Sequence, residues 1–182
     1  MRRSMVERAR GGDADAFDEL VTLDADRCLG IAFRITRDLR LAEDAVQEAL
    51  VLVWRDLPKL RDVERYEMWL HRLVVNACYT ELRRRRRWTD RIAMLPVERA
   101  DGADPYRSAD ERDALERAFA RLPADRRAMF VLRHYAGLSL AEIAEVVGLP
   151  VGTVKSRLHY ATDTLQAALA ADARLERSEA RS

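Results

Sequence analysis

The stretch between Ser139 and Pro150 contains the local signals that constrain the fold of this chain most strongly. Ser139 stands three residues before Glu142, and such a pair satisfies the free backbone donors at the start of a helix. Gly148 is a natural end for that helix, and Pro150 suits the first position of a following helix. Because only a short turn containing glycine separates the two helices, the pattern predicts a helix-turn-helix.

The second of these predicted helices has an apolar stripe and a cationic, hydrogen-bonding face. The stripe, which recurs at helical spacing, consists of Val154, Leu158, Ala161 and Leu165. No acidic residue occurs from residue 151 to residue 162. Small and basic side chains on an exposed helix fit the major groove of DNA, although an ordinary solvated face is the simpler alternative. The candidate DNA-binding residues on this face are Gly152, Thr153, Lys155, Ser156, Arg157, His159 and Tyr160.

The composition extends the prediction of helix to the whole chain. Hydrophobic residues make up 48% of it, and there are only seven glycines and five prolines. Ala, Leu, Arg and Glu dominate and favour helix, and no alternating segment rich in Val, Ile and Thr predicts a strand. We therefore predict an all-α fold, with helical segments at about residues 14–35, 42–57, 65–87, 110–121, 124–136, 140–147 and 150–170.

The helical periodicity is interrupted between about residues 89 and 110. This stretch contains Pro96, Gly102 and Pro105 and more acidic than basic residues, a composition that favours a flexible linker. The prediction is therefore two small helical domains, at residues 1–90 and 111–172, joined by a flexible linker at residues 91–110. A disordered, charged tail is expected at residues 173–182.

Several classes of protein are excluded by what the sequence lacks. Cys28 and Cys78 form no CxxC pair, and His71, His134 and His159 lie on different segments without metal or catalytic spacing. We therefore expect no metal, no cofactor and no enzymatic activity, with both cysteines buried as apolar residues. Charges interrupt every apolar run, which predicts no membrane insertion and a cytoplasmic location. The net charge of +1 does not exclude nucleic acid, since a local patch is sufficient.

The predicted helix at residues 42–57 has a face that is partly acidic and partly apolar. Its core side carries Val46, Ala49, Leu50, Val53 and Leu57. The opposite side carries Asp44, Gln47, Glu48, Val51 and Arg55. An apolar residue within a polar face suggests a surface that docks on another protein, although periodicity alone fits a solvated face equally simply.

The predicted helix at residues 65–87 combines cationic, amide and aromatic side chains within one sector, namely Arg65, Arg72, Asn76, Tyr79, Arg83 and Arg87. It ends in five consecutive arginines followed by Trp88. Cations neutralise phosphates, amides bind bases and aromatic rings stack on them, so this strip matches what nucleic acid requires. Taken alone, the arginine run is also consistent with a solvated helix end that favours cations.

Three segments resemble conserved regions of the sigma factors of bacterial RNA polymerase. LSLAEIAEVVGLPVGTVKSRLHYATDTL, at residues 138–165, resembles the fourth conserved region, although LuxR-type regulators have a similar helix-turn-helix. AEDAVQEALVLVWRDL, at residues 42–57, resembles the second region where it binds the polymerase. YEMWLHRLVVNACYTELRRRRR, at residues 66–87, resembles the segment that melts and reads the −10 promoter element. The short layout without a third region resembles the extracytoplasmic-function (ECF) group.

The resemblance implies an alternative sigma factor with core RNA polymerase, promoter DNA and an anti-sigma factor as partners. It implies a docking face for core polymerase at Asp44, Gln47, Glu48, Val51 and Arg55. It implies −10 contacts at Arg61, Tyr66, Trp69, Arg72, Asn76, Arg83, Arg84 and Arg87, and −35 contacts at the seven candidates on the helix after Pro150. Thr80 departs from the family's usual Asp, and the loop at residues 61–64, which in the family captures a flipped base, lacks the usual Gly or Ser. A LuxR-like DNA-binding regulator is the alternative.

Overall fold

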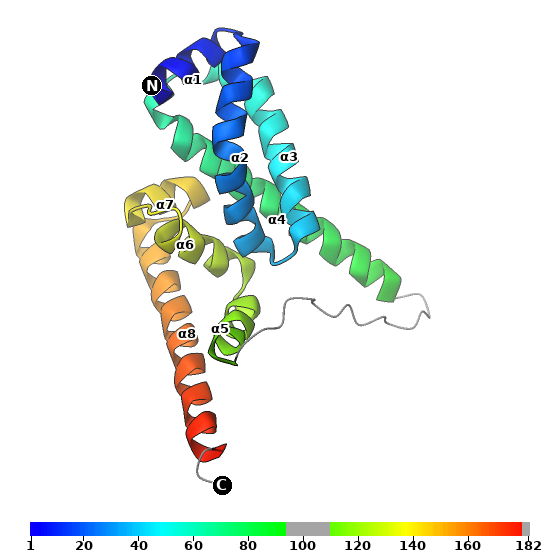
Figure 1. Ribbon diagram of the computed structural model, residues 1–182, viewed down its shortest axis with the longest axis vertical. Coiled ribbons are helices and arrows are strands. Elements are labelled where there is room, and N and C mark those ends of the chain that lie inside the picture. The colour runs from blue at the N-terminus through cyan, green and yellow to red at the C-terminus, as the bar shows by residue number, and fades with distance from the viewer. Residues whose placement is uncertain (94–109, 180–182) are drawn as a thin grey trace.

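The computed structural model describes residues 1–93 and 110–179, and within these ranges it contains helices and no strands (Figure 1). The all-α prediction is confirmed. The elements are α1 Arg2–Arg10, α2 Ala14–Thr36, α3 Leu39–Asp56, the 3₁₀ turns η1 Leu57–Lys59 and η2 Val63–Arg65, α4 Tyr66–Ala93, α5 Asp110–Arg121, α6 Ala124–His134, α7 Leu140–Val147 and α8 Val151–Glu179.

The observed boundaries differ from the predicted ones mainly at the two ends of the chain. Helix α1 was not predicted, because no side chain caps its start at Met1. Helix α8 continues to Glu179, whereas the sequence led us to expect a disordered tail from residue 173. An alanine-rich stretch without Gly or Pro gives the helix no reason to end earlier. The predicted linker lies mostly at residues 94–109, outside the described residues.

The N-terminal module consists of α1 to α4 around one apolar core. Asp13 caps α2 by accepting from the N–H of Ala16 at 3.0 Å, and Asp38 caps α3 by accepting from the N–H of Leu41 at 3.1 Å. The predicted core side of the helix at residues 42–57 is confirmed for Val46, Ala49 and Val53 of α3 and for Leu57, which lies in η1, whereas Leu50 is only half-buried. Cys28 and Cys78 are both buried, as expected, and burial raises the pKa of each thiol to about 12.

The C-terminal module consists of α5 to α8 and contains the predicted helix-turn-helix. The N–H of Ser139 donates to the Glu142 carboxylate at 2.7 Å, and the N–H of Glu142 donates to the Ser139 hydroxyl at 3.3 Å. Gly148 ends α7 with a φ of +69°, in the left-handed region that glycine adopts without strain. The predicted stripe of Val154, Leu158, Ala161 and Leu165 is buried. The helix-turn-helix that these local signals predicted is therefore present in the fold.

The two modules pack against each other, α2 on α6 and α4 on α7 (Figure 1). The buried guanidinium of Arg127 on α6 donates through Nε to the carbonyl of Ile35 at 2.9 Å and through Nη1 to that of Ala120 at 2.8 Å. The ring of Tyr135 lies against Gly30 of α2 and stacks under the guanidinium of Arg34, 3.9 Å from the ring centre. The modules thus share one continuous core.

Candidate nucleic-acid interface

The predicted docking face on α3 is open to solvent. Asp44, Gln47, Val51 and Arg55 are exposed, and Glu48 is half-buried. Val51 is 60% exposed, which confirms an apolar side chain in the middle of a polar surface. These five residues line one shallow depression with Leu52, Glu81 and Arg84. The sequence therefore identified a set of side chains that the fold brings together.

An apolar groove between α2 and α3 adjoins the docking face and was missed by the sequence analysis. It shares Gln47 and Val51 with that face and is otherwise lined by apolar side chains of α2 and α3, with acidic side chains among them. Trp54 is 58% exposed, and its ring meets that of Phe17 edge-on at 4.7 Å between centroids. Trp54 is the residue from which this groove could have been predicted, since a large aromatic side chain outside the predicted core side of α3 is not needed for packing within the module.

The residues predicted to contact the −10 element do not all lie on one surface. Arg61, Arg72 and Asn76 are exposed, and Trp69 is half-buried. Tyr66 is instead 3% exposed, and its hydroxyl donates to Asp24 at 3.0 Å inside the core. Burial beside that carboxylate raises the pKa of the Tyr66 hydroxyl. The structure thus places Tyr66 in the core at the start of α4, away from the exposed strip.

A cleft of about 350 Å³ lies at the start of α4. Its walls are the loop after η1 and the first turns of α4, with Arg61, Asp62, Trp69 and Arg72. Helix α7 closes one side through Glu145 and Val146, and Glu145 forms an ion pair with Arg65. The C-terminal module therefore covers part of the strip that was predicted to contact nucleic acid.

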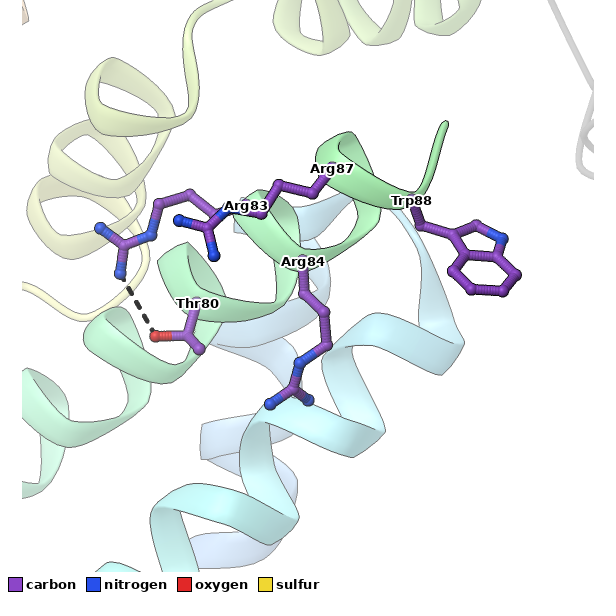
Figure 2. Close-up of a pocket in the computed structure, with 5 residues that line it drawn as sticks. All are labelled: Thr80, Arg83, Arg84, Arg87 and Trp88. Carbon is purple, nitrogen blue, oxygen red and sulfur yellow. Dashed lines mark hydrogen bonds between the residues drawn. The ribbon is translucent and has the colours of Figure 1, made fainter. Parts of the chain in front are cut away.

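The far end of α4 presents a dense cationic surface, shown in Figure 2. Thr80, Arg83, Arg84, Arg87 and Trp88 line a concave region there. Arg83 donates to the Thr80 hydroxyl at 3.4 Å, whereas Arg84 points toward α3 (Figure 2). Arg84 also pairs with the buried Glu81 at 2.7 Å. Trp88 is 64% exposed and points away from the core, which makes it an additional candidate for contact with a base or sugar.

The recognition face of α8 is exposed at the side chains that the sequence predicted. Gly152, Lys155, Ser156, His159 and Tyr160 are exposed, while Thr153 and Arg157 are half-buried. Three of these side chains have partners nearby. Arg157 pairs with Asp125 at 2.6 Å, Arg126 lies 3.9 Å above the Tyr160 ring, and His159 lies 3.4 Å from Asp163. The face is therefore held in place by its own module.

The histidines do not form a site. His71 is buried on α4, and desolvation together with the positive charge of Arg27 lowers its pKa to about 4. His134 and His159 are exposed on α6 and α8. Within residues 1–93 and 110–179, no group of three metal-ligating side chains comes together, and no helix is both long and apolar enough to span a membrane.

Two family profiles match the chain in the order of its modules. The profile of Sigma-70 region 2 matches residues 20–88, which contain the docking face and the strip on α4. The profile of Sigma-70, region 4 matches residues 112–163, which contain the helix-turn-helix. Because the N-terminal module matches a sigma region, the alternative of a LuxR-like regulator has no support.

Individual relatives and solved structures agree with these profiles. The RNA polymerase sigma-H factor of Pseudomonas aeruginosa is 32% identical over 179 residues, covering 92% of this chain and 93% of that protein. The ECF RNA polymerase sigma factor SigW of Bacillus subtilis is 26% identical over 178 residues, covering 91% and 95%.

Among solved structures, CnrH in complex with the cytosolic domain of CnrY has a TM-score of 0.68 at 26% identity, covering 94% of this chain and 98% of that one. The sigma factor RpoE of Bartonella quintana, in complex with the anti-sigma factor NepR, has a TM-score of 0.66 at 27% identity, covering 84% and 96%. The chain therefore belongs to the sigma-70 family of RNA polymerase sigma factors, as an alternative sigma factor of the extracytoplasmic-function group.

Proposed function

We propose that this sigma factor acts by binding alone, without catalysis, and divides initiation among three surfaces. The α3 docking face holds core polymerase, the strip on α4 binds and opens the −10 element, and the recognition face of α8 reads the −35 element. The observation that carries this proposal is the cationic end of α4. Arg83, Arg84 and Arg87 line one concave region with the exposed Trp88, which combines phosphate neutralisation with a ring for stacking.

The docking face suits a protein partner better than DNA. Its acidic side chains, Asp44 and Glu48, would repel phosphates, while the exposed Val51 would gain by burial. The adjoining groove adds Trp54 and Phe17, large side chains of the type that dominates binding energy at interfaces. We propose that the polymerase covers both the face and the groove.

The two modules must separate before both promoter elements can be bound. Elements centred at −10 and −35 lie about 25 base pairs apart, or about 85 Å at about 3.4 Å per base pair. Helix α7, which immediately precedes the recognition helix, is packed directly on α4. We propose that binding to polymerase selects the open arrangement and exposes the cleft at Arg61 and Trp69.

A partner that stabilises the packed arrangement would inhibit transcription. RpoE of Bartonella quintana, which shares the fold over most of this chain, was solved with an anti-sigma factor. We propose that this sigma factor also has an anti-sigma partner. Because a ligand shifts a conformational equilibrium only by its differential affinity, such a partner must bind the packed form more tightly than the open form.

The test is transcription by core bacterial RNA polymerase to which the purified protein is added. The template is fragmented DNA from the source genome, and the 5′ ends of the RNA are sequenced. Discrete start sites that share two upstream motifs are the expected result. Absence of new start sites, together with failure to co-elute with core polymerase, would contradict the proposed function.

A matched pair of variants separates docking from DNA binding. Val51→Asp places a charge at the centre of the docking face and should weaken core binding at least about tenfold, since burying an unpaired carboxylate is costly. Leu23→Asp makes the same kind of change at another exposed apolar residue, on α2 outside the groove, and should have little effect. If both variants bound core polymerase equally well, the docking face would not be the surface that binds the polymerase.

A further inference from the structure

Helix α1 lies across the N-terminal end of α2, beside the segment that joins α3 to α4 (Figure 1). It precedes the part of the chain that matches Sigma-70 region 2, which begins at residue 20. Its buried side chains, Met5, Val6 and Ala9, join the core of the module. It also contacts both 3₁₀ turns, η1 and η2, and the loop at residues 61–64 follows η1 and extends into η2. We call this loop the capture loop, after the role that the family resemblance gives it.

One hydrogen bond joins α1 directly to the backbone before the capture loop. The guanidinium of Arg10 donates through Nη1 to the carbonyl of Leu60 at 3.2 Å, in a half-buried environment. Leu60 follows η1 with extended backbone angles and immediately precedes Arg61. A charged donor on a carbonyl makes a stronger hydrogen bond than a neutral one. Arg10 therefore fixes the direction in which the chain enters the loop.

The exit from the loop is held by α1 as well. Arg2 pairs with the buried carboxylate of Asp24, and that carboxylate accepts the hydroxyl of Tyr66, the first residue of α4. Arg3 adds an ion pair with Glu64 at 2.8 Å, but both of these side chains are more than 60% exposed, so solvent screens the interaction. Both ends of the capture loop are thus tied to α1, at the entry by Arg10 and at the exit by Arg2, which acts through Asp24 of α2.

The loop also forms a wall of the cleft at the start of α4. Arg61 and Asp62 line this cleft together with Trp69 and Arg72. Asp62 is itself held by a local turn, because its carboxylate accepts the N–H of Glu64 at 3.0 Å. A side chain that discriminates between bases must be held close to its productive position. The backbone at Leu60 sets that position for Arg61 and Asp62.

We propose that α1 is a positioning element for the capture loop, and that Arg10 thereby sets the preference for the base bound in the cleft. This inference rests on the proposed function, because it assumes that the cleft receives a base of the −10 element. Arg10 acts through the loop and touches no DNA. Its removal should therefore alter base preference more than it alters overall binding.

The experiment uses holoenzyme reconstituted from core polymerase and the full-length variants Arg10→Met and Arg10→Lys. Transcription is measured from promoters that carry each of the four bases at each −10 position. Arg10→Met keeps the length of the side chain and removes the donors, so the ratio between the best and the worst base should fall about fivefold at one position. Arg10→Lys, which retains a cationic donor, should recover part of that ratio.

Arg8→Met is the matched control, since Arg8 is an exposed arginine of the same helix that pairs with Asp13 outside the loop. It should leave the base preference unchanged. Uniform loss of transcription from all four promoters with Arg10→Met would reduce Arg10 to a structural role and overturn the proposal, as would an unchanged preference. The wild-type protein in the same assay tests the proposed function separately, because its failure to initiate at all would remove that function whatever the variants do.

Discussion

The two longest helices, α4 and α8, have 28 and 29 residues, but they are built into the molecule differently. The middle of α4 is buried on two sides, against its own module and beneath the C-terminal module, with Leu70, His71, Val74, Val75 and Cys78 at most 2% exposed. Along α8 the buried residues form the single stripe of its own module. Helix α4 is therefore anchored at its centre and projects a free end, whereas α8 is held along its side.

Some cations at the end of α4 also differ from Arg157 of α8, although Arg84 and Arg85 of α4 pair with Glu81 and Asp38. Within the described residues, no carboxylate pairs with Arg83, Arg86 or Arg87 of α4. On α8, Arg157 is paired with Asp125 and fixed in place. Free arginines favour phosphates without reading sequence, while fixed small polar groups such as Ser156 can read base edges. We infer that affinity resides mainly on α4 and specificity for the −35 element on α8.

The largest expected effect comes from removing the free cations of α4. The triple variant Arg83→Ala, Arg86→Ala and Arg87→Ala should lower open-complex formation about 100-fold, at about 1 kcal/mol for each lost phosphate contact. Binding to core polymerase should be unchanged, because Arg84, which lies beside the docking face, is retained. Permanganate reactivity of the −10 region measures the opened DNA.

Arg40→Ala removes an exposed cation at the start of α3 and serves as the control for loss of charge. It should leave permanganate reactivity near the wild-type value. If the triple variant opened DNA as well as Arg40→Ala does, affinity would not reside on the end of α4.

The second effect tests the two-sided burial of α4 through His71. Its pKa is lowered from 6.5 to about 4, so the unfolded chain binds a proton more readily than the folded chain between these values. The stability that the neutral ring contributes is therefore complete above pH 6.5 and is lost as the pH falls toward 4. By pH 5 this loss should be about 2 kcal/mol. Urea unfolding at pH 7.5 and pH 5 measures it.

His71→Phe replaces the ring with one that cannot be protonated and should lose less stability between pH 7.5 and pH 5 than the wild type. His134→Phe, at an exposed histidine of α6, should behave like the wild type. An equal acid-induced loss in the wild type and in His71→Phe would mean that α4 is not buried on this side in solution.

The third effect concerns two neighbouring side chains on the recognition face of α8. Ser156→Ala should change the preference at one position of the −35 element by about 1 kcal/mol, or about fivefold, because a hydroxyl can bond a base edge. Lys155→Ala should instead weaken binding to all sequences alike and reduce the salt slope by about 0.9. Holoenzyme binding to promoters with single substitutions, over a range of salt, distinguishes the two.

Gln166→Ala changes an exposed residue further along α8, past the predicted recognition face, and should have neither effect. A uniform loss from Ser156→Ala, with no change in base preference, would mean that this face contacts phosphates as α4 does. The division between affinity and specificity would then disappear.

The smallest effect concerns the contact between α4 and α7. Glu145→Arg replaces the ion pair with Arg65 by a repulsion and should raise the population of the open form about two- to threefold, a modest change because both side chains are about half exposed. The exchanged pair Arg65→Glu with Glu145→Arg should restore the packed form. Hydrogen exchange of α7 and the radius of gyration measure the equilibrium, and equal values for all three proteins would exclude a role for this pair in holding the modules together.

Much of the fold could be predicted because its signals are local. Hydrophobic periodicity located α2 to α8, and the capping box with Gly148 located the turn before the recognition helix. Helix α1 was not predicted, since it has few apolar residues and no capping side chain. Its stability comes from packing onto α2 and the 3₁₀ turns, which its own sequence does not reveal.

Candidate site residues could be predicted from the sequence only where the 3.6-residue period of a helix determines which side chains are exposed. The docking face of α3 and the recognition face of α8 are exposed on the sides of these helices that the helical period predicted. Tyr66 shows the limit of this kind of prediction. The family motif assigned it a contact with the −10 element, whereas in the fold it is buried and its hydroxyl bonds Asp24. Trp88 and Trp54 show the reverse, since both are exposed aromatics that periodicity alone did not select.

By itself, the sequence determined helices α2 to α8 and which faces of α3 and α8 are polar, because residues three and four apart share a face whatever surrounds them. Only the tertiary structure decided that the modules pack together. Arg127 bonds the carbonyl of Ile35, 92 positions earlier in the chain, and Tyr135 seats on Gly30, where a larger residue would collide with the Tyr135 hydroxyl. Neither contact can be predicted from the periodicity of one helix, because each depends on where two helices that are distant in the sequence meet in space.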